Sequence, residues 1–502
     1  MKKILTFALA AVLVLGLLAG CKPTEEQVNE DGLPYRKLVV MYPFISGEQR
    51  DTNLVLAEVN KYLKEKINAE IQLEGIGFGA HAQKWPLMLQ TNEQIDVLWQ
   101  KGNDIVQNVP RKAYLALDDL LDKYGKDVKA CFTPDVLEGI KMEGKIYALP
   151  AYKELAMNAC LYYDIEIAER NGIDYANIAT FADLDKALEK IKANEEQIPL
   201  WIARGTYLPT GSLKAEGEDM LRYEDVQGSL IVGTGGQPLL VLDTQTDKII
   251  MRYQSPYQVE KYKYARDWYL KGYINQDAAT ADGDTRTFTA WISGGSGKPG
   301  SAELATATSG TPYGGGVATP IIMSGNSLTG SMINIPSSSV DPERAMMLIN
   351  LLYSDEYLIN LLQFGIEGKH YIKNADGTMA MLEGDKLRGD SGYYPATEWV
   401  IGNQFINYLY ETESPTKAQD YLDYNAAATM AKSTGFIFNS ENVKTENAAL
   451  STILDEYMRL IDCGAVDPEP ALAEMTNKMN AVGAEKVLAE AQKQYDEWKA
   501  AK

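Results

Sequence analysis

Apolar positions early in the chain occur first as a run and then at helical spacing. Leu38–Tyr42 is continuously apolar and predicts a buried strand. A helix then begins at Asp51 or Thr52. Its apolar stripe consists of Val55, Val59, Tyr62, Leu63 and Ile67. Strict alternation over residues 69–74 predicts a second strand; a short helix near 83–90 and a strand at 96–99 follow. This β-α-β-α-β order predicts a parallel sheet covered by helices, an α/β fold.

The carboxyl ends of these strands predict where a ligand would bind. Open parallel sheets bind ligands at that edge. Residues 42–47 and 99–103 follow the first and third predicted strands, so Tyr42 and Trp99 are candidates for a binding cleft. Trp99 is equally compatible with a core position at the end of a strand.

The remaining pattern predicts a second set of strands and helices. We expect strands at 145–149, 157–163, 198–203, 288–292, 321–323 and 332–335, and a hairpin at 370–382. We expect helices at 115–124, after Thr180, after Ser255-Pro256, after Asp341-Pro342, after Asp355, and through most of the chain from Asp455. The helix after Ser255-Pro256 is expected to carry Val259, Tyr262, Arg266 and Tyr269 on one face. Residues 294–300 are predicted to form a glycine-rich loop. Trp85 and Trp268 lie in helical stripes and are expected in the core.

The first twenty-one residues have the pattern of a secretory signal. Lys2 and Lys3 precede an apolar run, Ile4–Leu18, which ends in Ala19-Gly20-Cys21. This ending resembles a bacterial lipobox, which implies lipidation of Cys21 and a lipid-anchored protein on the extracellular face of the membrane. The alternative, a spanning helix, is disfavoured because the run is shorter than about 20 residues.

Length and charge restrict the partners. Without residues 1–20 the net charge changes from −21 to −23, because Lys2 and Lys3 are removed. An acidic body is repelled by nucleic acid and anionic lipid. The chain is too long for one core, so we expect two lobes. The expected organisation is a signal peptide at 1–20, a tether at 21–34, the first part of lobe 1 at 35–151, the first part of lobe 2 at 152–300, a return to lobe 1 at 301–360, and a mainly helical segment at 361–502 packed on lobe 2 and the cleft.

Few residues suit catalysis or metal binding. The two histidines, His81 and His370, are far apart, and Cys131, Cys160 and Cys463 have no paired spacing, so we expect free thiols and no zinc site. Gly297-Lys298 lacks the remaining residues of a phosphate loop. We expect no metal, no cofactor and no catalytic residues, although two carboxylates at the right separation would suffice for a glycosidase.

Several stretches resemble the sugar-type family of bacterial extracellular solute-binding proteins, in its Firmicutes lipoprotein subclass. They are residues 60–68, 117–124, 144–150, 297–300, 364–371, 402–405, 443–446 and 464–468, of which Phe364–Tyr371 is the most specific. The resemblance implies a periplasmic-binding-protein-like type II fold, with two α/β lobes joined by crossing strands and a ligand cleft between them. It also implies a monomer that delivers its ligand to the permease subunits of an ABC importer.

A sugar offers polar edges and apolar C–H faces, so its site combines flat aromatic rings with hydrogen-bonding side chains. The candidates on predicted loops are Tyr42, Trp99, Tyr152, Trp291, Lys298, Trp399, Asn403 and Phe436. Each is also compatible with a core or surface role, and Lys298 alternatively stabilises contacts between the lobes. We expect an oligosaccharide as ligand. A peptide on the same scaffold and a surface polysaccharide-degrading enzyme are the alternatives.

Overall fold

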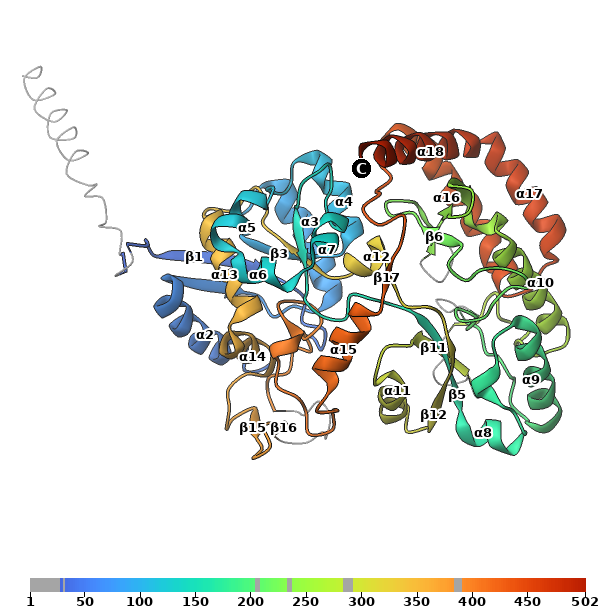
Figure 1. Cartoon of the computed structure of the whole chain (residues 1–502), viewed down its shortest axis with the longest axis horizontal. Helices are drawn as coiled ribbons and strands as arrows, with labels where there is room; N and C mark the ends of the chain where they lie inside the picture. Colours follow the sequence, from blue (N-terminus) through green and yellow to red (C-terminus); the bar gives the residue numbers. More distant parts are fainter. Residues whose placement is uncertain (1–27, 30–31, 204–207, 233–236, 283–291, 383–390) are drawn as a thin grey trace, which may run out of the picture.

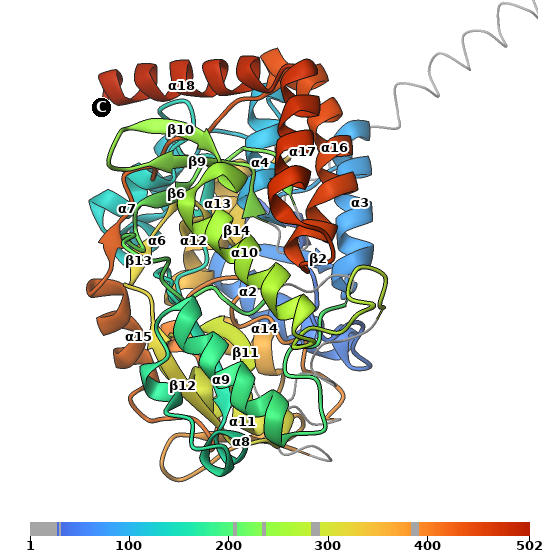
Figure 2. The ribbon, with the colours of Figure 1, turned by 90° about the vertical axis from the view of Figure 1, so that its right-hand side faces the viewer.

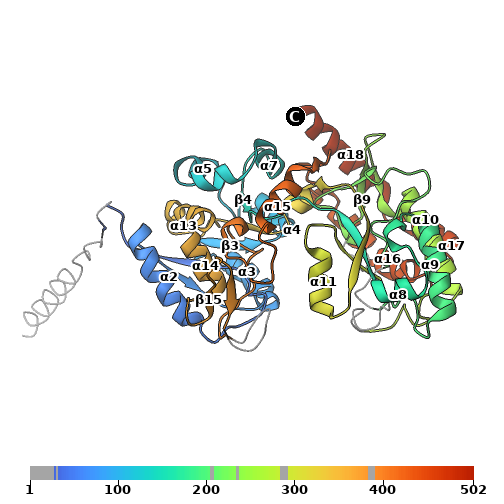
Figure 3. The same ribbon diagram turned by 60° about the horizontal axis from the view of Figure 1, so that its bottom comes forward.

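The chain folds into two α/β bodies connected by several crossing segments (Figure 1). The computed structural model describes residues 28–29, 32–203, 208–232, 237–282, 292–382 and 391–502. The first lobe is the body whose core draws on residues 38–156, 323–401 and Tyr424. The second lobe holds two adjoining cores, which draw mainly on residues 161–292 and 436–495. Figure 3 shows the two lobes beside each other, with α15 near their junction.

A five-stranded mixed sheet forms the centre of the first lobe, in the order β2-β1-β3-β14-β4. The first lobe contains β1 (Arg36–Met41), α2 (Thr52–Ile67), β2 (Ala69–Leu73), α3 (Phe78–Thr91), β3 (Val97–Gln100), α4 (Gly102–Asn108), α5 (Asp118–Tyr124), α6 (Lys126–Cys131), α7 (Pro134–Gly139), β4 (Ala148–Pro150), α12 (Gly325–Leu328), β14 (Met332–Asn334), α13 (Pro342–Ser354), α14 (Glu356–Phe364), β15 (Tyr371–Lys373), β16 (Met379–Met381) and α15 (Lys417–Ala426). β1 is parallel to β2 and β3, as predicted, whereas β14 is antiparallel to β3 and β4.

Side-chain caps fix the starts of two predicted helices of the first lobe, whereas α2 begins after Asp51 without a side-chain cap. Asp341 accepts a hydrogen bond from the Arg344 amide at the start of α13, and Asp355 accepts one from the Leu358 amide at the start of α14. These bonds satisfy amides that have no partner within the helix. α2 buries Val55, Val59, Leu63 and Ile67, which are members of its predicted stripe.

The second lobe contains three short antiparallel units covered by long helices (Figure 2). Its elements are β5 (Ala159–Asp164), α8 (Ile165–Arg170), α9 (Phe181–Asn194), β6 (Tyr223–Asp225), β7 (Ile231–Val232), β8 (Gln237–Pro238), β9 (Leu240–Asp243), β10 (Lys248–Met251), α10 (Pro256–Leu270), β11 (Ile292–Ser296), α11 (Ser301–Ser309), β12 (Tyr313–Ala318), α16 (Lys444–Asp462), α17 (Pro468–Ala481) and α18 (Ala484–Ala501). α9 begins after Thr180, as predicted, with a capping box formed by Thr180 and Asp183, and Trp268 is fully buried, as predicted.

Three predictions for the second lobe were wrong. No continuous strand forms at 198–203. Leu200 makes an isolated parallel bridge to Ile274, and at Ile202 the Asn275 side chain bonds both the amide and the carbonyl in place of a neighbouring strand. Gly294 and Gly295 belong to β11 and not to a loop; a side chain at Gly295 would lie 2.7 Å from the Tyr162 ring, so glycine permits this pairing with β5. The buried face of α10 holds Tyr262 and Trp268, while Arg266 and Tyr269 lie outside it.

Three segments cross between the lobes and are bonded to one another. Met157 and Ile322 form an antiparallel bridge, and β13 (Ile322–Met323) pairs in parallel with β17 (Thr429–Met430). The Asn425 side chain at the end of α15 accepts hydrogen bonds from the amides of Leu155, at 2.7 Å, and Ala156, at 3.0 Å. The crossing segments therefore form one junction, and α15 is fastened to it.

The cores suggest lobe boundaries that differ from those expected. β12 pairs with β5 in the second lobe, and Leu361, Leu362 and Val400 pack in the core of the first. We therefore propose that the chain returns to the first lobe near residue 319 and leaves it near residue 427. Only the C-terminal part of the predicted 361–502 segment then belongs to the second lobe.

Candidate ligand-binding site

Three aromatic rings gather around Trp99, which lies in β3 at the edge of the sheet where the sequence predicts a ligand-binding cleft. The rings of His81, Phe78 and Trp399 lie 5.6, 5.8 and 6.4 Å from the Trp99 ring, each in an edge-to-face arrangement. Trp99 is itself only 3% exposed. Its indole N–H donates to Ser331 Oγ at 2.7 Å, which satisfies the buried donor. Trp99 therefore organises the cluster without being its exposed surface.

The exposed faces of this cluster belong to Trp399 and Phe78. Trp399 is 36% exposed and Phe78 40%, which is unusual for rings of this size. The Lys101 ammonium lies 5.2 Å from the centre of the Phe78 ring. We call Trp399, Phe78 and Trp99 the aromatic platform. Such a surface suits a ligand with flat apolar faces and polar edges.

Three residues near the platform in the sheet or in the sequence have a buried polar atom without a hydrogen-bond partner among the described residues. These atoms are the Tyr42 hydroxyl, His81 Nε2 and Thr397 Oγ1. Burial raises the pKa of Tyr42 well above its usual range, so it stays a neutral phenol. Burial also lowers the pKa of His81 to about 4, against a hydrogen bond to the Met41 carbonyl, so the imidazole is neutral at pH 7. Buried polar groups normally have partners, so these three atoms are exceptions among the described residues.

A carboxyl group lies next to Trp399 in sequence. Glu398 accepts a hydrogen bond from the Tyr394 hydroxyl at 2.9 Å and a longer one from the Tyr410 hydroxyl at 3.5 Å. Burial raises the pKa of Glu398. The shown partners of this carboxyl are thus the hydroxyls of Tyr394 and Tyr410.

Tyr152 and Asn403 lie together, but the Asn403 amide is used within the protein. An isolated parallel bridge joins the two residues. Asn403 Nδ2 donates to the Tyr353 carbonyl at 3.1 Å, and Oδ1 accepts from the Phe405 amide at 2.9 Å. The Tyr152 ring packs against Phe405, 4.7 Å away. These contacts give both residues structural roles, and their predicted contact with ligand remains a prediction.

Lys298 and Phe436 have different surroundings. Lys298 Nζ lies 2.7 Å from Glu154 Oε1 and 5.4 Å from the centre of the Tyr421 ring. Although burial opposes ionisation of Glu154, Lys153 and Lys298 hold its pKa below the usual range. Lys298 thus connects the second lobe to the crossing segment, as its alternative role requires. Phe436 is buried against Tyr495 and Trp498. Trp291 and Cys21 lie outside the described residues.

Phe78, His81 and Ser331 were missed by the sequence analysis. Phe78 follows the second strand of the sheet after a short loop, so the edge rule that selected Tyr42 and Trp99 applies to it as well. His81 lies one turn further along the same helix. No sequence signal marks Ser331, because its partners are distant in the chain.

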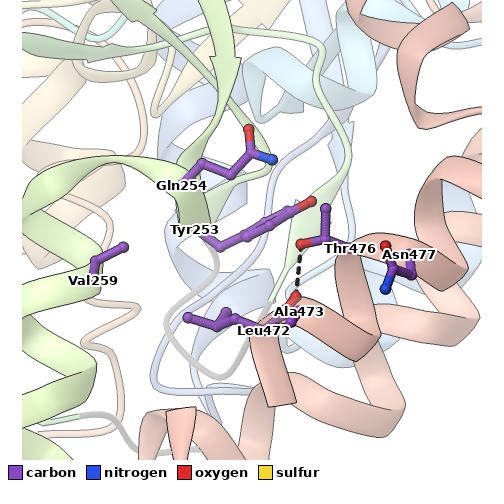
Figure 4. A pocket seen from close by; sticks show the side chains of 7 residues that line it. All are labelled: Tyr253, Gln254, Val259, Leu472, Ala473, Thr476 and Asn477. Atoms are coloured by element: carbon purple, nitrogen blue, oxygen red, sulfur yellow. Dashed lines mark hydrogen bonds between the residues drawn. The ribbon is translucent and has the colours of Figure 1, made fainter. Parts of the chain in front are cut away.

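A hollow in the second lobe has no such convergence of groups (Figure 4). Its volume is about 280 Å³, and it lies between α17 and the segment that leads into α10. Its lining residues are Tyr253, Gln254, Val259, Leu472, Ala473, Thr476 and Asn477. Thr476 donates its hydroxyl to the Leu472 carbonyl at 2.7 Å. The hollow contains none of the predicted site residues and no charged side chain.

Metal ligands do not cluster in the part of the chain that the structure describes. No group of three or more His, Cys, Asp or Glu side chains there is arranged to hold a metal ion. Cys131, Cys160 and Cys463 are free thiols, and the last two are buried. Within the described residues, no helix has the length and apolar character needed to cross a membrane.

The fold and the family follow from comparison with known proteins. The family model of bacterial extracellular solute-binding proteins matches residues 57–366, so the chain belongs to this family, as predicted from its sequence stretches. The fold is of the periplasmic-binding-protein-like type II, also as predicted. A second model, of a domain of unknown function, matches residues 432–500, which include α16, α17 and α18.

Two relatives from Streptococcus pneumoniae are similar over nearly the whole chain. A carbohydrate ABC transporter substrate-binding protein is 27% identical and covers 98% of this chain and 97% of the relative. The crystal structure of the N-glycan transport solute binding protein NgtS has a TM-score of 0.77 at 26% identity, over 92% of this chain and 98% of that one. Its complex with Man5GlcNAc has a TM-score of 0.68 at 26% identity, over 93% and 99%. Each is named as a substrate-binding or solute-binding protein.

Proposed function

We propose that the protein captures an oligosaccharide between its lobes and delivers it to the permease subunits of an ABC importer. The aromatic platform carries this proposal. Its partly exposed rings, Trp399 at 36% and Phe78 at 40%, lie against Trp99 at the carboxyl edge of the first-lobe sheet. β1 runs toward the second lobe (Figure 1), so this edge is on the side where the lobes would meet. The relatives named for carbohydrate and N-glycan transport support an oligosaccharide as ligand.

Binding is proposed to close the lobes about the crossing segments. A ligand held by both lobes makes its full contacts only when they approach, so it favours the closed state. Lipidation at Cys21 is proposed to hold the monomer on the extracellular face of the membrane. No catalytic step is proposed.

Titration with a panel of glycans tests this function against its alternatives. Man5GlcNAc is the first probe, because it is the ligand in a structure of a similar protein. Calorimetry should detect saturable binding of at least one oligosaccharide, and chromatography of the recovered glycan should show no shortened product. Binding of peptides alone would support the peptide alternative, and glycan shortening would support an enzyme.

A further inference from the structure

A single buried hydroxyl connects the two tryptophans of the aromatic platform. Ser331 lies immediately before β14 and is 2% exposed. Its Oγ accepts the indole N–H of Trp99 at 2.7 Å and donates to the carbonyl of Val400 at 2.9 Å. Its own carbonyl accepts the Ala151 amide at 3.0 Å, which holds the backbone in place. The hydroxyl therefore has one partner on β3 and another on the residue after Trp399.

The segments joined by Ser331 are far apart in the chain. Trp99 and Val400 both pack in the core of the first lobe, and the Ser331 hydroxyl bonds to each of them. The bond to the indole N–H fixes the orientation of the Trp99 ring, and the bond to Val400 fixes the turn that carries Trp399. The two rings then lie 6.4 Å apart at 80°. A shift of either partner would change the direction of the exposed Trp399 face.

We infer that Ser331 is a positioning residue for ligand binding, acting through the Trp99–Trp399 pair. It touches no ligand itself, because its hydroxyl is buried and already used as donor and acceptor. This inference rests on the proposed function. Removing the hydroxyl leaves the Trp99 N–H and the Val400 carbonyl without their partner, and each is then driven to move toward another hydrogen-bonding group.

A double-mutant cycle separates positioning from a general effect on folding. Ser331→Ala should weaken binding of the glycan about tenfold in the wild-type background but less than about twofold when Trp399 is already alanine. An equal loss in both backgrounds would overturn the inference, because Ser331 would then act independently of Trp399. Ser229→Ala is the matched control. Ser229 is a buried serine of the second lobe whose Oγ accepts the Leu240 amide at 3.0 Å. It should leave glycan affinity unchanged.

Near-ultraviolet circular dichroism of the unliganded protein gives a readout that requires no glycan. Aromatic pairs in fixed geometry contribute to this spectrum, so Ser331→Ala and Trp399→Ala should change it in the same bands, while Ser229→Ala should not. A wild-type spectrum for Ser331→Ala would overturn the positioning role whatever the protein binds. Changed spectra together with no glycan binding by the wild-type protein would support the geometry but contradict the proposed function.

Discussion

Replacing Trp399 with alanine is the most direct test of the aromatic platform. The substitution removes the largest exposed apolar face in the cluster and leaves Trp99 bonded to Ser331. If a sugar stacks on this face, the variant loses the contact while the polar groups around the platform remain. The expected result is weaker binding with an intact fold.

The size of the effect follows from the exposed area. A tryptophan side chain has about 250 Å² of surface, so the 36% that is exposed corresponds to about 90 Å². Covering this area is worth about 2 kcal/mol, or roughly a fortyfold change in affinity. The buried remainder contributes up to about 4 kcal/mol to folding on the same coefficient, which is an upper bound. The melting temperature should therefore also fall.

Isothermal titration calorimetry, performed well below the melting temperature of the variant, measures the affinity. Tyr357→Ala is the matched control, because Tyr357 is 48% exposed and packs on Tyr62 of the outer helix α2. It should lose stability to a similar degree and keep its affinity. An unchanged affinity in Trp399→Ala, or an equal loss in both variants, would refute the stacking argument.

Three further predictions concern other parts of the molecule. Cys21→Ser should abolish lipid labelling and release the protein from the membrane fraction; labelling that persists would contradict the lipobox assignment. Small-angle scattering should show a smaller radius of gyration on saturation with a glycan that binds, and an unchanged radius would count against closure. Between pH 6.5 and pH 4, His81 is protonated in the unfolded state but neutral in the folded state, because burial lowers its pKa to about 4. The free energy of unfolding of the wild-type protein should therefore fall by up to about 3 kcal/mol over this range. The variant His81→Gln lacks the imidazole and should not show this fall. The contribution of neutral His81 to the free energy of unfolding should be fully present above pH 6.5. Urea denaturation curves with the same pH dependence for both proteins would contradict this account.

Local signals predicted the starts of several helices in both lobes because short-range contacts decide them. Capping at Thr180, Asp341 and Asp355 depends on residues three positions away, which the sequence displays. The antiparallel strand β14 completes the sheet from a distant part of the chain. The missing strand at 198–203 has a similar cause, since Asn275 occupies its hydrogen-bonding groups.

The candidate site was predictable only in part. The rule for parallel sheets placed Trp99 at the carboxyl edge of the sheet, but it could not tell that Trp99 is buried and Trp399 exposed. That distinction depends on which ring packs against Ser331 and which lies outside. Phe436 is an aromatic residue on a predicted loop and was therefore a candidate, yet it packs against Tyr495 and Trp498 in a core. Aromatic residues on predicted loops are therefore candidates for ligand binding, but the sequence does not show which of them the fold buries.

The order in which the chain crosses between the lobes has a consequence for its synthesis. The core of the first lobe joins Leu38 to Tyr424, and the last core of the second lobe needs residues up to Tyr495. Neither lobe is a contiguous fragment, so neither can be expressed by truncating the gene. Most of the chain must leave the ribosome before the first core can close. A growing chain cannot complete its first lobe until Tyr424 has been made, and an incompletely folded polypeptide is the form that can be threaded through a narrow membrane pore.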